Sequence, residues 1–150
     1  MDFSEKFIAF VDILGFESLV RSAESGDGKI TLSKLLELTT KLGSPDDRKL
    51  FETHGPIVCP VSTYIRRDLD FQVTQITDCV IVSTEISPAG AINLIGHCWQ
   101  AVMRLLDQGI MCRGYITRGK IYHAQGQFIG SGYQNAYHKE QTITAFKRDP

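Results

Sequence analysis

Two aspartates stand in apolar surroundings where a carboxylate is hard to explain as an ordinary structural residue. Asp12 lies near the end of the apolar run at residues 7–13 (FIAFVDI), and Asp78 lies between Ile76 and Val80. An unpaired buried carboxylate is costly, so each needs a cation or a set of hydrogen bonds. If the two apolar runs are neighbouring strands, both carboxylates reach one site, and paired acids suit one or two Mg²⁺ ions. The alternative is that Asp12 caps a helix and Asp78 is a hairpin-turn residue.

A glycine and two basic residues offer contacts for phosphate. Gly15 and Phe16 follow Asp12 at an expected strand-to-helix junction, where backbone amides can hold a phosphate. A lone glycine also serves plain turn geometry. Alternation with a period of two places Arg118 and Lys120 on one face if their strand is continuous. These two cations suit a triphosphate and a solvated face equally well.

Hydrophobic periodicity predicts the elements that position these residues. Short β-branched and aromatic runs predict strands at residues 7–13, 57–65, 71–76, 79–83, 110–116 and 119–123. Amphipathic spacing predicts helices at residues 16–22, 32–43, 88–109 and 132–141, and Ser87 and Pro88 suit the start of the third. Residues 44–56 are expected to form a loop, Gly126 and Gly130 to bracket another, and residues 142–146 to begin a strand.

This order predicts an α+β fold with a ferredoxin-like βαββαβ core, in which an antiparallel sheet carries helices on one face. The chain has 150 residues, of which 43 % are hydrophobic and 22 % charged. This composition fits a single domain over residues 1–150 that buries a core of its own. Such a plan hosts many functions, so the fold alone does not identify the activity.

Charge and composition exclude several classes of function. Lys and Arg total 16 and Asp and Glu total 17, which leaves no excess of positive charge for a nucleic-acid polymer. The N-terminus does not resemble a signal peptide, and no apolar stretch approaches the roughly 18 residues of a membrane-spanning helix. The four cysteines form no C-x-x-C pair and the four histidines no zinc-type spacing, which favours reduced thiols in a cytoplasmic protein.

Four segments occur in the order found in the catalytic domains of class III nucleotidyl cyclases: FIAFVDILGFESLV, QITDCVIVS, RGYITRGKI and IGSGYQNAYHKE. The chain resembles that family over about residues 7–146, and most closely the bacterial Pycsar-type cyclases, which make cyclic pyrimidine nucleotides. The resemblance implies a class III cyclase-like fold. The family's closing strands, with a phosphate-contacting lysine, would lie beyond Pro150. Either the chain lacks its last strands, or Arg113 or Arg118 takes that role.

The resemblance assigns Asp12 and Asp78 as the two metal-binding aspartates, with the backbone carbonyl of Ile13 as a further ligand. Gly15 and Phe16 would contact the phosphates. The implied cofactors are two Mg²⁺ or Mn²⁺ ions per site. The resemblance also implies a homodimer with interfacial active sites, in which one protomer supplies the aspartates and the other the base-reading and transition-state groups.

The last expected helix carries the implied transition-state residues. If Ala136 is matched to the family's helix alanine, Gln134 falls on the family's asparagine and His138 on its arginine. Gln keeps an amide, whereas His in place of Arg loses a permanent charge and a bidentate donor. An alignment shifted by one residue would instead offer Asn135 and Lys139.

The implied base-reading positions are Thr74 and Gln127. Adenine-specific members of the family usually carry Lys and Asp at these positions, and guanine-specific members carry Glu and Cys. A neutral hydrogen-bonding pair therefore fits another base. Tyr64 is a further candidate for the base pocket, with ordinary sheet packing as the alternative.

The implied activity is an intramolecular phosphoryl transfer. A nucleoside triphosphate, UTP before CTP, becomes the 3′,5′-cyclic monophosphate with release of pyrophosphate. The product would act on a separate cyclic-nucleotide effector in bacterial anti-phage defence. Two alternatives stay open: a catalytically degenerate cyclase-like domain that only binds nucleotide or a protein partner, and an ordinary adenylate or guanylate cyclase.

Overall fold

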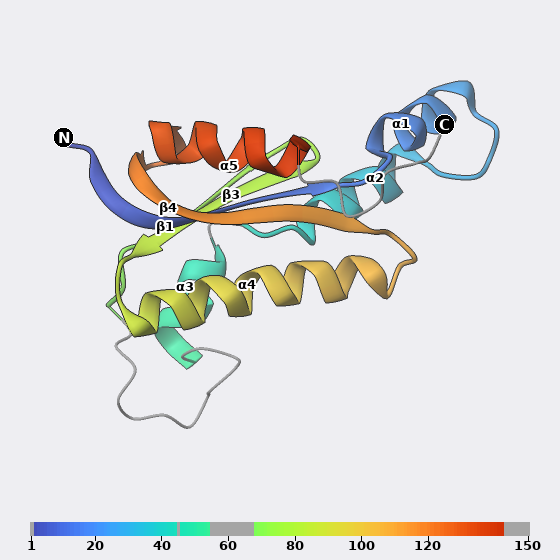
Figure 1. Cartoon of the computed structure of the whole chain (residues 1–150). Helices are drawn as coiled ribbons and strands as arrows, with labels where there is room; N and C mark the ends of the chain where they lie inside the picture. The colour runs from blue at the N-terminus through green and yellow to red at the C-terminus, as the bar shows by residue number, and fades with distance from the viewer. Residues whose placement is uncertain (1, 45, 55–67, 143–150) are drawn as a thin grey trace.

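The computed structural model describes residues 2–44, 46–54 and 68–142, which form an antiparallel sheet with helices packed on both faces (Figure 1). Five strands pair in the order β2-β3-β1-β4-β5. They are β1 (Ser4–Ile13), β2 (Phe71–Ile76), β3 (Cys79–Glu85), β4 (Cys112–Ala124) and β5 (Gln127–Ile129). The helices are α1 (Phe16–Ser25), α2 (Leu32–Thr40), α3 (Asp46–His54), α4 (Pro88–Leu106) and α5 (Ser131–Thr142). None of these helices is long and apolar enough to cross a membrane. The predicted α+β class and antiparallel sheet are confirmed.

The central strand β1 is apolar from Phe7 to Val11 because helices cover both of its faces. On one face Val11 belongs to a core that includes Leu94 and Leu105 of α4. On the other face Phe10 belongs to a core that includes Ala136 of α5. The expectation that helices lie on one face only is wrong, because α4 covers one face and α5 covers the opposite face (Figure 1).

Two local predictions are confirmed in detail. Strands β2 and β3 form a hairpin whose turn is Thr77 and Asp78, and Thr77 adopts the left-handed conformation with φ of 47°. Helix α4 begins at Pro88, and the Ser87 side chain accepts a hydrogen bond from the Gly90 backbone amide at 3.0 Å. Both elements start where the sequence places them.

The loop predicted at residues 44–56 is wrong, because residues 46–54 form helix α3. Its first turn carries Asp46 and Asp47, and acids near a helix N-terminus are favoured by the helix dipole. The backbone amide of Ser44 donates to the Asp47 carboxylate at 2.7 Å. These interactions at its N-terminus stabilise a helix in a segment whose polar composition predicted a loop.

The break predicted at residues 117–118, between two strands, is also wrong, because β4 is continuous from Cys112 to Ala124. Within it, helix α5 crosses at Gly119, where a Cβ would lie 2.7 Å from the Cα of Gly132. Gly126, with φ of 76°, turns the chain into strand β5 rather than into a loop. The strand expected at residues 57–65 lies outside the described residues. So does the strand expected from residue 142, except Thr142 itself, which ends α5.

Candidate active site

Asp12 and Asp78 come together because β1 lies beside the β2-β3 hairpin. The Ile13 backbone amide donates a hydrogen bond to the Asp78 carbonyl oxygen at 2.9 Å, which ties the end of β1 to the hairpin turn. Asp12 stands in register with Cys79 on one side and Arg113 on the other. The expectation that these strands are neighbours is confirmed.

The Asp12 carboxylate is largely buried, and one of its oxygens has no hydrogen-bond donor among the described residues. Its side chain is 18 % exposed, and Oδ1 accepts no hydrogen bond from the described residues. Arg113 provides an ion pair instead, with Nε 3.4 Å from Oδ1. Burial raises the pKa of the Asp12 carboxyl, Arg113 opposes this, and the nearby charge of Asp78 adds to it. The helix-capping alternative for Asp12 is wrong, because Gly15 occupies the N-cap of α1.

The donor set at this place suits a divalent cation. Asp12 offers a buried oxygen that no donor satisfies within the described ranges, and Asp78 offers a carboxylate whose Oδ1 accepts a hydrogen bond from Thr77 at 2.8 Å. The described part of the chain holds no group of three or more His, Cys, Asp and Glu side chains placed to bind a metal. Two carboxylates completed by backbone, water or substrate phosphate match the way Mg²⁺ binds in nucleotide-dependent enzymes. The Ile13 carbonyl stays a predicted ligand.

A third carboxylate, Glu140 of α5, lies against the same arginine and was not predicted. Its side chain is 1 % exposed, and Arg113 Nε forms an ion pair with its Oε1. Burial raises the pKa of Glu140, and the charge of Asp12 adds to this effect. The missed signal is helical spacing, because Glu140 follows Gly132 and Ala136 at intervals of four on the buried face of α5.

The cysteines beside the aspartates are half-buried free thiols. Cys79, Cys98 and Cys112 are free, and Cys59 lies outside the described residues. Burial raises the pKa of Cys79 to about 12 and that of Cys112 to about 11, and neighbouring carboxylates add to both shifts. Neither thiol is a nucleophile at neutral pH.

Gly15 and Phe16 lie at the strand-to-helix junction that the sequence predicts. Gly15 has φ of 73°, a conformation that disfavours other residues, and a Cβ at this position would meet nothing within 4 Å. The backbone at the N-terminus of α1 is therefore open to approach. Its contact with phosphate stays a prediction.

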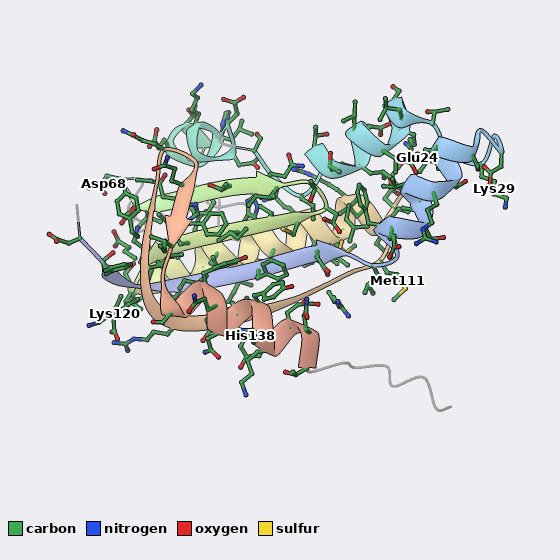
Figure 2. The ribbon with its side chains drawn as sticks, turned by 90° about the horizontal axis from the view of Figure 1, so that it is seen from above. Glu24, Lys29, Asp68, Met111, Lys120 and His138 are labelled. Carbon is green, nitrogen blue, oxygen red and sulfur yellow. The ribbon has the colours of Figure 1, made fainter. Side chains whose placement is uncertain are left out.

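Arg118 and Lys120 share an exposed face of the continuous strand β4 (Figure 2 labels Lys120). Arg118 donates two hydrogen bonds to Glu5, at 3.1 and 2.5 Å. In the register of β1 and β4 it stands five positions from Asp12, or about 17 Å along the strands. Within one chain, Arg113 rather than Arg118 is the arginine beside the aspartates.

The Thr74 hydroxyl is hydrogen-bonded to His123, which was not predicted to be a site residue. Thr74 Oγ1 lies 2.8 Å from Nε2 of His123, and Ser83 Oγ lies 2.8 Å from Nδ1 of the same ring. Burial lowers the pKa of His123 to about 4, so the ring is neutral at pH 7. His123 pairs with Phe128 of β5, next to the exposed residue Gln127. Gln127 pairs with Ala124 instead, so its side chain points to the opposite face of the sheet from the His123 ring, and the chain does not bring the two predicted base-reading residues together.

Gln134 and His138 lie on the exposed side of α5, whose buried side consists of Gly132, Ala136 and Glu140. Figure 2 labels His138 on this helix. At 100° per residue, the exposed pair is about half a turn away from that buried stripe. The side chains implied to stabilise the transition state therefore point away from the sheet of their own chain.

The alternative pair from the shifted alignment, Asn135 and Lys139, is exposed as well. Asn135 Nδ2 donates a hydrogen bond to Thr117 Oγ1 at 3.3 Å, so its amide is engaged within the chain. Tyr64 lies outside the described residues. The assignment of the transition-state pair stays a prediction.

Solved structures match this chain, whereas no protein-family model and no curated protein does. One match is a bacterial light-regulated adenylyl cyclase, with a TM-score of 0.58 at 17 % identity over 93 % of this chain and 40 % of that one. Another is the dimeric guanylyl cyclase domain of the RhoGC fusion protein from the aquatic fungus Blastocladiella emersonii. It has a TM-score of 0.57 at 12 % identity, over 95 % of this chain and 76 % of that one.

These likenesses show the fold of the chain. Its sheet and helices have the arrangement of adenylyl and guanylyl cyclase domains, the class III nucleotidyl cyclase fold. The fold implied by the sequence resemblance is confirmed. The chain spans about two fifths of the length of the bacterial enzyme. At this identity the likeness concerns fold, so the residues of the site carry the argument about activity.

Proposed function

We propose that the protein is a nucleotidyl cyclase, which converts a nucleoside triphosphate into the 3′,5′-cyclic monophosphate and pyrophosphate. The observation that carries the proposal is the Asp12 carboxylate at the end of β1 in a cyclase fold. Its Oδ1 is buried without a donor from the described residues, beside the turn that holds Asp78. A buried anionic oxygen without donors supports a role in binding a cation.

The reaction would be an in-line attack of the ribose 3′-oxygen on the α-phosphorus, with the bond to pyrophosphate breaking. Two Mg²⁺ or Mn²⁺ ions bound at the site would favour loss of the 3′-hydroxyl proton and offset the charge of the pyrophosphate. Asp12 and Asp78 would hold these ions. Arg113, at 36 % exposure, would pair with phosphate oxygens, and the backbone at Gly15 and Phe16 would orient the polyphosphate.

A homodimer with interfacial sites is part of the proposal. Gln134 and His138 are exposed on the side of α5 that faces away from Asp12 and its sheet. A second copy could receive these side chains at its own aspartates. One structural neighbour is described as a non-canonical dimer, which supports dimerisation as part of the proposal.

A pyrimidine substrate, UTP before CTP, is the proposed specificity. Thr74 and Gln127 carry no charge, and the pKa of His123 is lowered to about 4, so that ring is neutral as well. Neutral donors and acceptors suit the carbonyl and amine edge of a pyrimidine. The product would serve as a messenger for a separate effector in anti-phage defence.

A second candidate is a cyclase-like domain that binds nucleotide and does not turn it over. His138 favours it, because an exposed histidine at the implied arginine position carries no permanent charge. Such a domain would retain metal-dependent nucleotide affinity and form no cyclic product.

The test is incubation of the protein with ATP, GTP, CTP or UTP separately, with Mn²⁺ or Mg²⁺, and detection of products by mass. We expect a cyclic pyrimidine monophosphate, lowered at least about 100-fold by Asp78→Asn because a carboxylate ligand is lost. The matched control is Asp107→Asn, which removes an exposed aspartate at the end of α4.

Each product pattern has a distinct meaning. A cyclic purine product would keep the cyclase and overturn the pyrimidine specificity. Product that survives Asp78→Asn would overturn the assigned site. Absence of product from all four nucleotides, with metal-dependent nucleotide binding intact, would favour the non-catalytic candidate.

A further inference from the structure

Arg113 is shared between two carboxylates that come from different elements. Its Nε lies 3.4 Å from Asp12 Oδ1, and it also forms an ion pair with Oε1 of Glu140. Asp12 faces Arg113 across the β1-β4 register, whereas Glu140 reaches it from the last turn of α5. One guanidinium therefore serves two anions on the sheet face that α5 covers.

The position of Glu140 is unfavourable in three respects. Its side chain is 1 % exposed, so the carboxylate has lost its hydration. Neither of its oxygens accepts a hydrogen bond from the part of the chain that the structure describes. It also lies two residues before the C-terminus of α5, where the helix dipole disfavours an anion. The contact with Arg113 is what offsets these three costs.

We infer that Glu140 is a positioning residue of the active site: it anchors Arg113 so that a divalent cation can replace the guanidinium at Asp12. This inference rests on the proposed function, because it requires Asp12 to bind the cation. In this role Glu140 acts through Arg113, with which it forms an ion pair, and not as a metal ligand.

Electrostatic repulsion explains why Arg113 needs a second anionic partner when a cation binds at Asp12. A cation at Asp12 repels Arg113, and a guanidinium without another anion would have to compete with the metal for Asp12. With Glu140 present, Arg113 has a second partner and stays at the site. Its side chain is 36 % exposed there, compared with 18 % for Asp12, so it remains open to an anionic substrate.

The test is a titration with Mn²⁺ alone, in which bound ion is measured from the loss of the free-ion electron paramagnetic resonance signal. Glu140→Gln is expected to weaken Mn²⁺ binding on the order of fivefold, the scale of one charge contact at a partly exposed site. The same substitution in an Arg113→Gln background is expected to cause no further loss, because the competing cation is gone. Glu37→Gln is the matched control, since Glu37 pairs with Lys34 and Lys41 on α2.

Equal losses in both backgrounds would overturn the inference, because Glu140 would then act on the metal directly. No loss in either background would overturn it as well. If Glu140→Gln does not fold, Glu140→Asp replaces it: this variant keeps the charge but withdraws it from Arg113, and unchanged Mn²⁺ binding would contradict the inference. Failure of both variants to fold would make the role of Glu140 structural and the inference wrong.

The same Mn²⁺ titration distinguishes failure of the proposed function from failure of this inference. Wild-type protein that binds no Mn²⁺, or binds it equally well after Asp78→Asn, would overturn both. Binding that depends on Asp78 but is insensitive to Glu140 would overturn the positioning role alone.

Discussion

At the residue scale, the buried imidazole of His123 makes folding sensitive to pH. Its ring bridges Thr74 and Ser83, and burial lowers its pKa from 6.5 to about 4. The unfolded chain therefore binds this proton more readily than the folded chain between pH 6.5 and 4, so stability falls as the pH falls through that window. The loss attributable to His123 is about 2 kcal/mol between pH 7 and pH 5.

Urea unfolding at pH 7 and pH 5 checks this prediction. His123→Gln is expected to be less stable at pH 7 and to lose less stability on acidification than the wild type. His97, also buried with a lowered pKa, contributes equally to both proteins and cancels in the comparison. The exposed His54→Gln should behave as wild type. Equal pH dependence of wild type and His123→Gln would contradict the assignment.

Some residues of the candidate site were predicted from the sequence, and others were missed. Asp12 and Asp78 were predictable as neighbours because a carboxylate in an apolar run is costly and each run has a strand signature. Glu140 was missed although it follows Gly132 and Ala136 at helical spacing, because its burial depends on how α5 packs and the surrounding sequence YHKE is polar. The partners of Thr74 were missed for a similar reason, since His123 reaches Thr74 only through the pairing of distant strands.

At the element scale, α5 can approach the sheet closely because glycines meet where it crosses β4. A Cβ on Gly132 would lie 2.4 Å from Ile8 Cδ1 and 3.0 Å from the carbonyl carbon of Gly119. Gly132→Ala is therefore expected to push α5 outward and to lower the free energy of unfolding by about 2 kcal/mol, the usual cost of overpacking. It should also weaken Mn²⁺ binding, because α5 carries Glu140.

Denaturant unfolding and the Mn²⁺ titration together measure this effect. Gln141→Ala, an exposed substitution on the same helix, is the control and should change neither quantity by more than experimental error. A Gly132→Ala protein as stable as the wild type would show that the sheet accommodates the methyl group and that the close approach is not required.

The helix start and the hairpin turn that the sequence predicted correctly are both determined by residues close together in the chain. The Ser87 cap and the Thr77-Asp78 turn are read within a few residues, and both are confirmed. Gly119 was placed at the start of a separate strand, and its part in the packing of α5 could not be predicted because that contact joins distant segments. The second covered face was missed because the buried stripe of α5 is small or charged rather than apolar.

At the scale of the whole molecule, the groups of the candidate site point in different directions. Asp12 and Arg113 are on the sheet face that α5 covers, whereas Gln134 and His138 point away from that sheet. Under the proposed function, a single chain would present two half-sites, which a second copy would combine. An isologous dimer of two such chains would contain two complete sites, each built from both protomers.

Complementation between two inactive variants tests this arrangement. We expect Asp78→Asn and the double substitution Gln134→Ala with His138→Ala to be inactive separately, since each destroys one half of every site. Mixed in equal amounts under conditions that allow subunit exchange, half of the dimers are heterodimers with one intact site of two, so about a quarter of wild-type activity should return. Differently tagged chains would verify that heterodimers form. Heterodimers without recovered activity would place all the catalytic groups of one site on one chain, and an active monomer would do the same.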